Sequence, residues 1–160
     1  MTLDLEAKKV LLRKIPHGIF ICTVREGDEI NGFTASWVTQ GSFAPPLVVM
    51  AVRSEGSSHG IIQRTNQFSL NVLRADQKEL AAVFFKPQKG LGGRFEAAPY
   101  NFGENGLPLL EDAIGGIECN VVGNVANGDH TVFVAEVISA KLNADGDPLI
   151  LSDTGWSYGG

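Results

Sequence analysis

The stretch Asn31–Ser58, NGFTASWVTQGSFAPPLVVMAVRSEGSS, decides the fold of this chain. Residues 33–38 combine aromatic, β-branched and hydroxyl side chains, a composition typical of a strand. Residues 47–52 form a continuous apolar run that is short enough to be a buried strand. Two strands so close together in the chain, with a proline-rich connection between them, predict a β-rich fold.

The connections around these two strands carry polar groups. Asn31-Gly32 predicts a turn, because both residues tolerate positive φ. Gln40–Phe43 is expected to be a polar break, made rigid by Pro45 and Pro46, which donate no N–H. A glycine-containing loop with one cation and several hydroxyls follows the second strand, at Arg53, Ser54, Ser57 and Ser58. Hydroxyls, backbone amides and a guanidinium at the ends of buried strands suit a planar polar ring and a phosphate.

Composition narrows the class of protein. The chain has 160 residues, 44% of them hydrophobic and 19% charged, which predicts one domain over residues 1–160 with a real core. Nineteen glycines and seven prolines indicate many turns, as in an all-β fold. The net charge of -5 disfavours binding to nucleic acid or to an anionic membrane. No apolar run approaches the ~20 residues of a membrane span and no signal-peptide core is visible, so a cytoplasmic location is expected.

Further elements follow from periodicity and turn signals. Helices are expected over residues 3–14, from an N-cap at Ser57 or Ser58 to about Thr65, and after Asp76, where Glu79 completes a weak capping box. Long strands at residues 117–125 and 131–140 flank the hairpin signal Asn127-Gly128-Asp129. Pro148–Leu151 predicts a short final strand. Cys22 and Cys119 fall inside strands, are expected to be buried thiols, and have no spacing typical of a metal site.

Several short motifs occur in a set order and spacing. They are T-A-S-W at Thr34–Trp37, S-F-A-P-P-L at Ser42–Leu47, R-S-E-G-S-S at Arg53–Ser58, F-S-L-N-V-L at Phe68–Leu73 with Gln77 and Leu80, G-R-F at Gly93–Phe95, and G-D-H-T at Gly128–Thr131. Together they resemble the flavin reductase-like family of FMN-binding split barrels, and the resemblance spans roughly residues 10–152. It implies a mainly antiparallel, Greek-key β-barrel with a few short peripheral helices.

The resemblance also implies site residues. The flavin phosphate would be held by Arg53, Ser54, Ser57 and Ser58. The ring edge and ribityl chain would meet the hydroxyls and backbone amides of Thr34, Ala35, Ser36 and Trp37, and the ring itself would meet Gln40, Gly41 and Ser42. Each cluster also has a plain structural interpretation, as an amphipathic strand, a capped helix with a solvated arginine, or a rigid connection.

Two further segments are interpreted through the same resemblance, and the C-terminal aromatic residues are left open. His130, in the G-D-H motif, would position the nicotinamide, although a histidine at a hairpin end is usually only an exposed polar residue. Arg94 and Phe95 would lie near the flavin in an otherwise irregular loop at residues 86–106. Trp156 and Tyr158, in the terminal G-W-S-Y-G-G, are open to packing over the barrel, packing against a partner, or shielding the flavin.

The expected function is an NAD(P)H-dependent flavin reductase that uses FMN in preference to FAD, forms a homodimer, and supplies reduced flavin to a monooxygenase or another acceptor. The alternatives are an electron-transfer module with tightly held FMN and a flavin-independent barrel for another small ligand. No GxGxxG follows a strand into a helix, so a nicotinamide would bind without a Rossmann domain.

Overall fold

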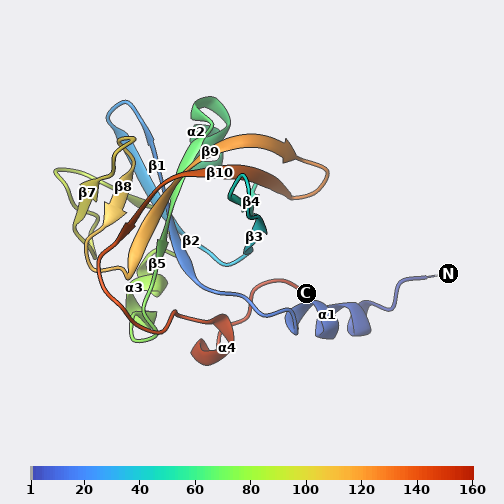
Figure 1. Ribbon diagram of the computed structural model, residues 1–160. Helices are drawn as coiled ribbons and strands as arrows, with labels where there is room; N and C mark the ends of the chain where they lie inside the picture. The colour runs from blue at the N-terminus through green and yellow to red at the C-terminus, as the bar shows by residue number, and fades with distance from the viewer. Residues whose placement is uncertain (1) are drawn as a thin grey trace.

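The computed structural model describes residues 2–160 and is mainly antiparallel β-sheet with short helices (Figure 1). Eight strands pair in the order β3-β4-β10-β9-β5-β1-β2-β6, and every pairing is antiparallel. This confirms the predicted fold class. The strands of this sheet are β1 (Phe20–Glu26), β2 (Glu29–Ala35), β3 (Val38–Ser42), β4 (Leu47–Arg53), β5 (Gln67–Val72), β6 (Gln88–Lys89), β9 (Gly115–Val125) and β10 (His130–Leu142), while β7 (Tyr100–Phe102) pairs with β8 (Pro108–Leu110) separately.

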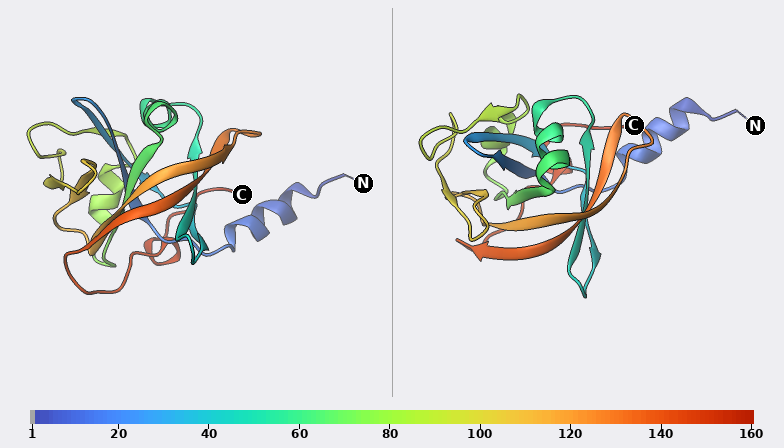
Figure 2. Two further views of the ribbon diagram at one scale, coloured as in Figure 1. Left: turned by 45° about the horizontal axis from the view of Figure 1, so that its top comes forward. Right: turned by 90° about the horizontal axis from the view of Figure 1, so that it is seen from above.

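A two-residue link forces the sheet to curl into a barrel. Strands β2 and β3 lie near opposite ends of the strand order, yet only Ser36 and Trp37 separate them in sequence. Such a link spans at most about 10 Å, so the two ends of the sheet must approach each other. The views in Figure 2 show the sheet wrapping around in this way. Trp37 therefore lies at the seam, where its carbonyl accepts a hydrogen bond from the Ala51 amide at 3.0 Å.

Two apolar clusters fill the structure. The first lies inside the barrel and includes Cys22, Phe68, Cys119 and Phe133. Burial raises the pKa of the Cys22 thiol well above its ordinary value and raises that of Cys119 to about 12, so both thiols are neutral. The second cluster lies outside the barrel wall and contains Ile19, Ile21, Ile30, Leu73, Ala81, Phe84, Phe95, Ala98, Tyr100, Leu110, Ala113 and Leu149.

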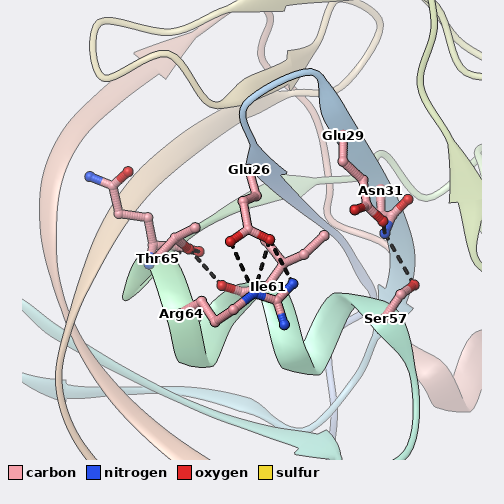
Figure 3. A network of polar contacts seen from close by, with 8 residues as sticks. Glu26, Glu29, Asn31, Ser57, Ile61, Arg64 and Thr65 are labelled. Atoms are coloured by element: carbon pink, nitrogen blue, oxygen red, sulfur yellow. Dashed lines mark hydrogen bonds and ion pairs between the residues drawn. The ribbon is translucent and has the colours of Figure 1, made fainter.

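Helix α2 (Ser57–Thr65) packs on the barrel through Ile61 and Ile62, both fully buried. Figure 3 shows how its outer side is tied to the neighbouring hairpin: Arg64 forms an ion pair with Glu26 at 2.6 Å. Hydrogen bonding from Arg64 lowers the pKa of the Glu26 carboxyl. This exposed pair contributes little stability by itself, but it joins the last turn of α2 to the end of β1.

The other helices are α1 (Leu5–Arg13), α3 (Lys78–Val83) and α4 (Leu151–Thr154). Helix α1 begins at Asp4, whose side chain accepts the Ala7 amide at 2.9 Å, and it buries none of its residues. It projects away from the barrel in Figures 1 and 2. Within residues 2–160, no helix is both long and apolar enough to cross a bilayer.

The turn predicted at Asn31-Gly32 is wrong, because both residues lie inside β2 and the hairpin turns at Gly27, whose φ is 60°. Gly32 is required there by packing rather than by a turn. A Cβ at Gly32 would lie 2.8 Å from Cε1 of Phe84. Gln40–Phe43 is also not a simple break, since β3 runs to Ser42 with a register shift between Gln40 and Ser42.

Two predicted helix caps are wrong as well. The N-cap of α2 is Gly56, with φ of 128° and no side-chain cap, so neither Ser57 nor Ser58 caps the helix. The N-cap of α3 is Gln77, so Asp76 and Glu79 form no capping box. Instead of the strand predicted at Pro148–Leu151, isolated bridges at Pro148 and Ile150 lead into α4.

Candidate functional site

A cavity of about 610 Å³ opens at the barrel seam. It lies between the end of β2, the end of β4, the first turn of α2, the region just after α3, and the C-terminal residues. Its lining residues are Ile19, Phe33, Thr34, Ala35, Ser36, Trp37, Ala51, Val52, Arg53, Glu55, Gly56, Ser57, Ser58, His59, Phe84, Phe85, Pro87, Leu151, Trp156, Ser157 and Tyr158. Aromatic side chains and backbone dominate one part, and hydroxyls with a guanidinium dominate another.

The polar part of the cavity is built to attract an anion. Helix α2 begins there with no side-chain cap and no acidic residue in its first turn, so no side chain of that turn satisfies its free amides. The Ser58 hydroxyl is buried with no hydrogen-bond partner within residues 2–160. Arg53, at the end of β4, is exposed and lines the same cavity. An orphaned buried hydroxyl, a helix N-terminus and a guanidinium together form an anion-binding arrangement.

Asn31 orients the neighbouring hydroxyl, as Figure 3 shows. Its Nδ2 donates to Ser57 Oγ at 3.1 Å and to Glu29 Oε1 at 3.3 Å. Because Asn31 occupies a lone pair of Ser57 Oγ, the Ser57 O–H remains available to donate to a ligand. Sequence reasoning missed this role, since it interpreted Asn31 as a turn residue. An asparagine that is only 2% exposed inside a strand is a signal visible only in the structure.

His59 also lines the cavity and is buried beside Ser58. Its Nε2 lies 2.8 Å from Thr131 Oγ1, and its ring centroid lies 5.7 Å from that of Phe133. Desolvation by burial lowers the pKa of His59, so the ring is neutral at pH 7. His59 therefore contributes shape and hydrogen bonding, and no positive charge, at neutral pH.

An aromatic group lies at the seam. The Trp37 ring centroid is 4.5 Å from that of His130 and 5.0 Å from that of Tyr158. Both ring nitrogens of His130 are engaged: Nδ1 lies 2.7 Å from the Asp129 carboxylate and Nε2 lies 2.8 Å from the Tyr158 hydroxyl. Hydrogen bonding with His130 lowers the pKa of the Asp129 carboxyl, so that carboxylate is ionised and acts as an acceptor.

The structure brings together only some of the residues predicted for the site. Those that line the cavity are Thr34, Ala35, Ser36, Trp37, Arg53, Ser57 and Ser58. Those that do not are Gln40, Gly41, Ser42, Ser54, Arg94, Phe95 and His130. Sequence reasoning left open the place of Trp156 and Tyr158, and it missed Phe84 and Phe85, because aromatic residues around a short helix resemble ordinary core.

Phe95 and Thr34 have other contacts than the sequence predicted. Phe95 is 1% exposed and packs on Phe84 with ring centroids 5.2 Å apart, so it lies one layer behind the cavity wall. Thr34 lines the cavity, but its hydroxyl donates to the Ala81 carbonyl at 2.7 Å. The Thr34 hydroxyl proton is thus already engaged in a hydrogen bond to α3. No cluster of three or more His, Cys, Asp or Glu side chains suited to a metal ion occurs in residues 2–160.

Comparison with known proteins gives matches to flavin reductases. Residues 12–159 match the model of the family described as "Flavin reductase like domain". The structure of NADH:FAD oxidoreductase SgcE6 from Streptomyces globisporus C-1027 superposes with a TM-score of 0.79 at 29% identity, covering 92% of this chain and 88% of that one. The split-barrel architecture of flavin reductases is therefore shared.

Two further relatives differ in how much of their own length this chain matches. The reductase component of 4-nitrophenol 4-monooxygenase/4-nitrocatechol 2-monooxygenase from Rhodococcus opacus is 31% identical over 82% of this chain and 69% of its own length. Diflavin flavoprotein A 1 from Synechocystis is 29% identical over 88% of this chain but only 25% of its own length. This chain thus spans about a quarter of the diflavin relative.

Proposed function

Because the chain belongs to the flavin reductase-like domain family, we propose that it is an NAD(P)H-dependent flavin reductase that takes FMN in preference to FAD. The proposed reaction converts NAD(P)H, a proton and oxidised FMN into NAD(P)⁺ and reduced FMN. The flavin, when bound, supplies the electron acceptor, and the protein supplies binding, orientation and shielding from water. We also propose that residues 1–160 form a single domain.

The observation that carries the proposal is the unpartnered, buried hydroxyl of Ser58 at an uncapped helix start. A buried hydroxyl without a partner costs about 1–3 kcal/mol, which a bound acceptor would recover. Arg53 and the Ser57 O–H face the same cavity. A phosphate dianion supplies several acceptor oxygens at once, so the terminal phosphate of FMN fits this end of the cavity.

The other end of the cavity suits the ring system. Ser36 and Trp37 lie at the seam, where the chain leaves β2 and is not paired as a strand. The Trp37 carbonyl accepts from Ala51, but the Ser36 backbone and the Trp37 amide are available to a planar polar ring. Phe84 and Phe85 provide apolar walls. We restrict the proposed flavin contacts to the predicted residues that line the cavity, and we assign His130 a positioning role toward the nicotinamide.

The monooxygenase reductase among the relatives supports a role in supplying reduced flavin to a separate oxygenase. The diflavin relative favours a second candidate, an FMN module that keeps its flavin and passes electrons within a larger assembly. Gel filtration of FMN-loaded protein separates the two. FMN that exchanges freely and supports continuous NADH oxidation indicates a reductase, whereas FMN that co-elutes and is reduced only once per protein indicates the electron-transfer module.

Ser58→Ala should have opposite effects on the empty and the loaded protein. Removal of an orphaned buried hydroxyl should raise the free energy of unfolding of the FMN-free protein by about 1 kcal/mol. The same change should weaken FMN binding by about 1 kcal/mol, because one hydrogen bond to the phosphate is lost. Urea unfolding and FMN titration measure the two effects. Ser54→Ala, in the same loop but outside the cavity lining, should change neither, and a destabilised Ser58→Ala protein would argue against the assigned role.

Helix α1 supports the proposed homodimer. Leu5, Val10 and Leu11 are each more than half exposed, and a nine-residue helix is marginal unless it packs on something. Light scattering at micromolar concentration should give twice the 17.1 kDa chain mass. Leu11→Glu should shift the protein toward monomer, and Glu6→Gln on the same helix should not. A wild-type monomer would contradict the dimer.

A further inference from the structure

The last five residues, Trp156–Gly160, form a tail that lies against the cavity and is fixed at both ends. At its start, Gly155 has φ of 77° and turns the chain back, and the Trp156 amide donates to Thr154 Oγ1 at 3.0 Å. The Trp156 ring meets that of Phe85 edge-on, with centroids 4.6 Å apart. At its end, the Gly159 carbonyl accepts from Arg13 Nε of α1 at 3.0 Å. Figure 1 shows the C-terminus beside α1.

Tyr158, in the middle of this tail, covers His130. Its hydroxyl lies 2.8 Å from His130 Nε2, and its ring packs on Trp37. Tyr158 lines the cavity while His130 does not, and the His130 side chain is only 10% exposed. Any ligand in the cavity therefore reaches His130 only after Tyr158 has moved.

The direction of the hydrogen bond follows from the other side of the ring. The Asp129 carboxylate can only accept, so Nδ1 carries a proton, and in the singly protonated tautomer that this bond selects Nε2 is an acceptor. The Tyr158 hydroxyl accordingly donates to Nε2. A carboxamide N–H₂ is also a donor and has the same polarity as the Tyr158 O–H.

The tail is fixed at its two ends, but Tyr158 between them is held by few contacts. Gly159 has φ of 94°, and a Cβ there would lie 2.8 Å from Cζ2 of Trp37, so only glycine lets the backbone lie flat on that ring. Tyr158 is 40% exposed, and the tail belongs to no strand. The single hydrogen bond and two ring contacts of Tyr158 can be exchanged for ligand contacts at little cost, as a movable cover requires.

We propose that Tyr158 is a latch over the nicotinamide part of the site. In the closed state its hydroxyl occupies His130 Nε2. In the open state the carboxamide of the pyridine nucleotide donates to the same nitrogen, so nucleotide and Tyr158 compete. The apparent nucleotide affinity is then the intrinsic affinity reduced by the fraction of open protein. This inference rests on the proposed function and adds to it a residue that controls nucleotide access.

The test is a calorimetric titration of FMN-loaded protein with NAD⁺, which binds without reaction. Tyr158→Phe removes the hydroxyl and keeps the ring, and should tighten NAD⁺ binding by roughly two- to tenfold, the population change that one net hydrogen bond supports. Gly159→Ala should act in the same direction by a different cause, the contact with Trp37. Ser152→Ala, on α4 and outside the cavity, is the matched control and should leave NAD⁺ affinity unchanged.

Hydrogen exchange supplies an independent readout. Saturating NAD⁺ should accelerate amide exchange in the tail of the wild-type protein, because the closed contacts are given up. Unchanged or weaker NAD⁺ affinity in both Tyr158→Phe and Gly159→Ala, with FMN bound normally, would overturn the latch and leave the proposed function intact. Failure of the wild-type protein to bind FMN would instead overturn the proposed function, and the latch with it.

Discussion

Replacing Arg53 by alanine should weaken FMN binding by about 1–3 kcal/mol, or roughly five- to 150-fold in Kd. Arg53 ends β4, lies opposite His130 in the β4–β10 ladder, and is exposed at the cavity. Among residues 2–160, no side-chain hydrogen bond or ion pair engages its guanidinium. The mutation should therefore lower FMN affinity and leave the stability of the fold unchanged. A charge-assisted hydrogen bond to phosphate is the interaction removed.

Riboflavin provides the internal control for this prediction, because it has the same ring and ribityl chain but no phosphate. It should bind wild-type and Arg53→Ala protein almost equally. Arg53→Lys keeps the charge and loses the planar fork, so its FMN affinity should fall between those two proteins. If Arg53→Ala weakens riboflavin as much as FMN, then Arg53 does not recognise the phosphate.

Glu118→Ala should lower the free energy of unfolding by about 3 kcal/mol, the range expected when buried donors lose their acceptor. Glu118, on β9, is fully buried, and its carboxylate accepts the amides of Asn105 and Leu107 at 3.0–3.1 Å. The loop folds tightly over the carboxylate, since a Cβ at Gly103 would lie 2.5 Å from Glu118 Cδ. Removing the carboxylate leaves the buried Leu107 amide and the partly buried Asn105 amide without their acceptor.

Urea unfolding of the FMN-free protein measures this effect. Glu118→Gln should be intermediate, because one oxygen still accepts while the added N–H₂ faces other donors. Ser139→Ala removes an exposed hydrogen bond to Glu104 in the same loop and should cost less than about 0.5 kcal/mol. A loss as small for Glu118→Ala as for Ser139→Ala would show that the loop does not depend on the buried carboxylate.

Local patterns predicted much of the barrel because they are repeated along each strand. The hairpin at Asn127–Asp129 has the expected turn residues between two apolar runs, and β9 and β10 form on either side of it. The buried run at residues 47–52 is likewise confirmed within β4. Alternation and turn chemistry act over a few residues, so a single sequence contains them in full.

Tertiary contacts decided the features that sequence reasoning missed. Asn31-Gly32 has the chemistry of a turn, but Phe84 and Ser57 lie more than 20 residues away and make those residues necessary inside a strand. The phosphate-binding prediction placed Ser57 and Ser58 correctly at the helix start, yet it assumed a serine cap, whereas the N-cap is Gly56 and no side chain caps the helix. The position of Tyr158 on His130 depends on a turn at Gly155 and on Arg13 of α1, and no local pattern contains that information.

The most direct test of the central claim is anaerobic mixing of the purified protein with FMN and NADH, followed through the visible absorbance of oxidised flavin. The flavin absorbance should bleach at a rate proportional to protein concentration. Omitting either the protein or the nicotinamide should abolish the reaction. If the protein reduces FMN no faster than the protein-free mixture does, with NADH and with NADPH, the assignment of this chain as a flavin reductase is contradicted.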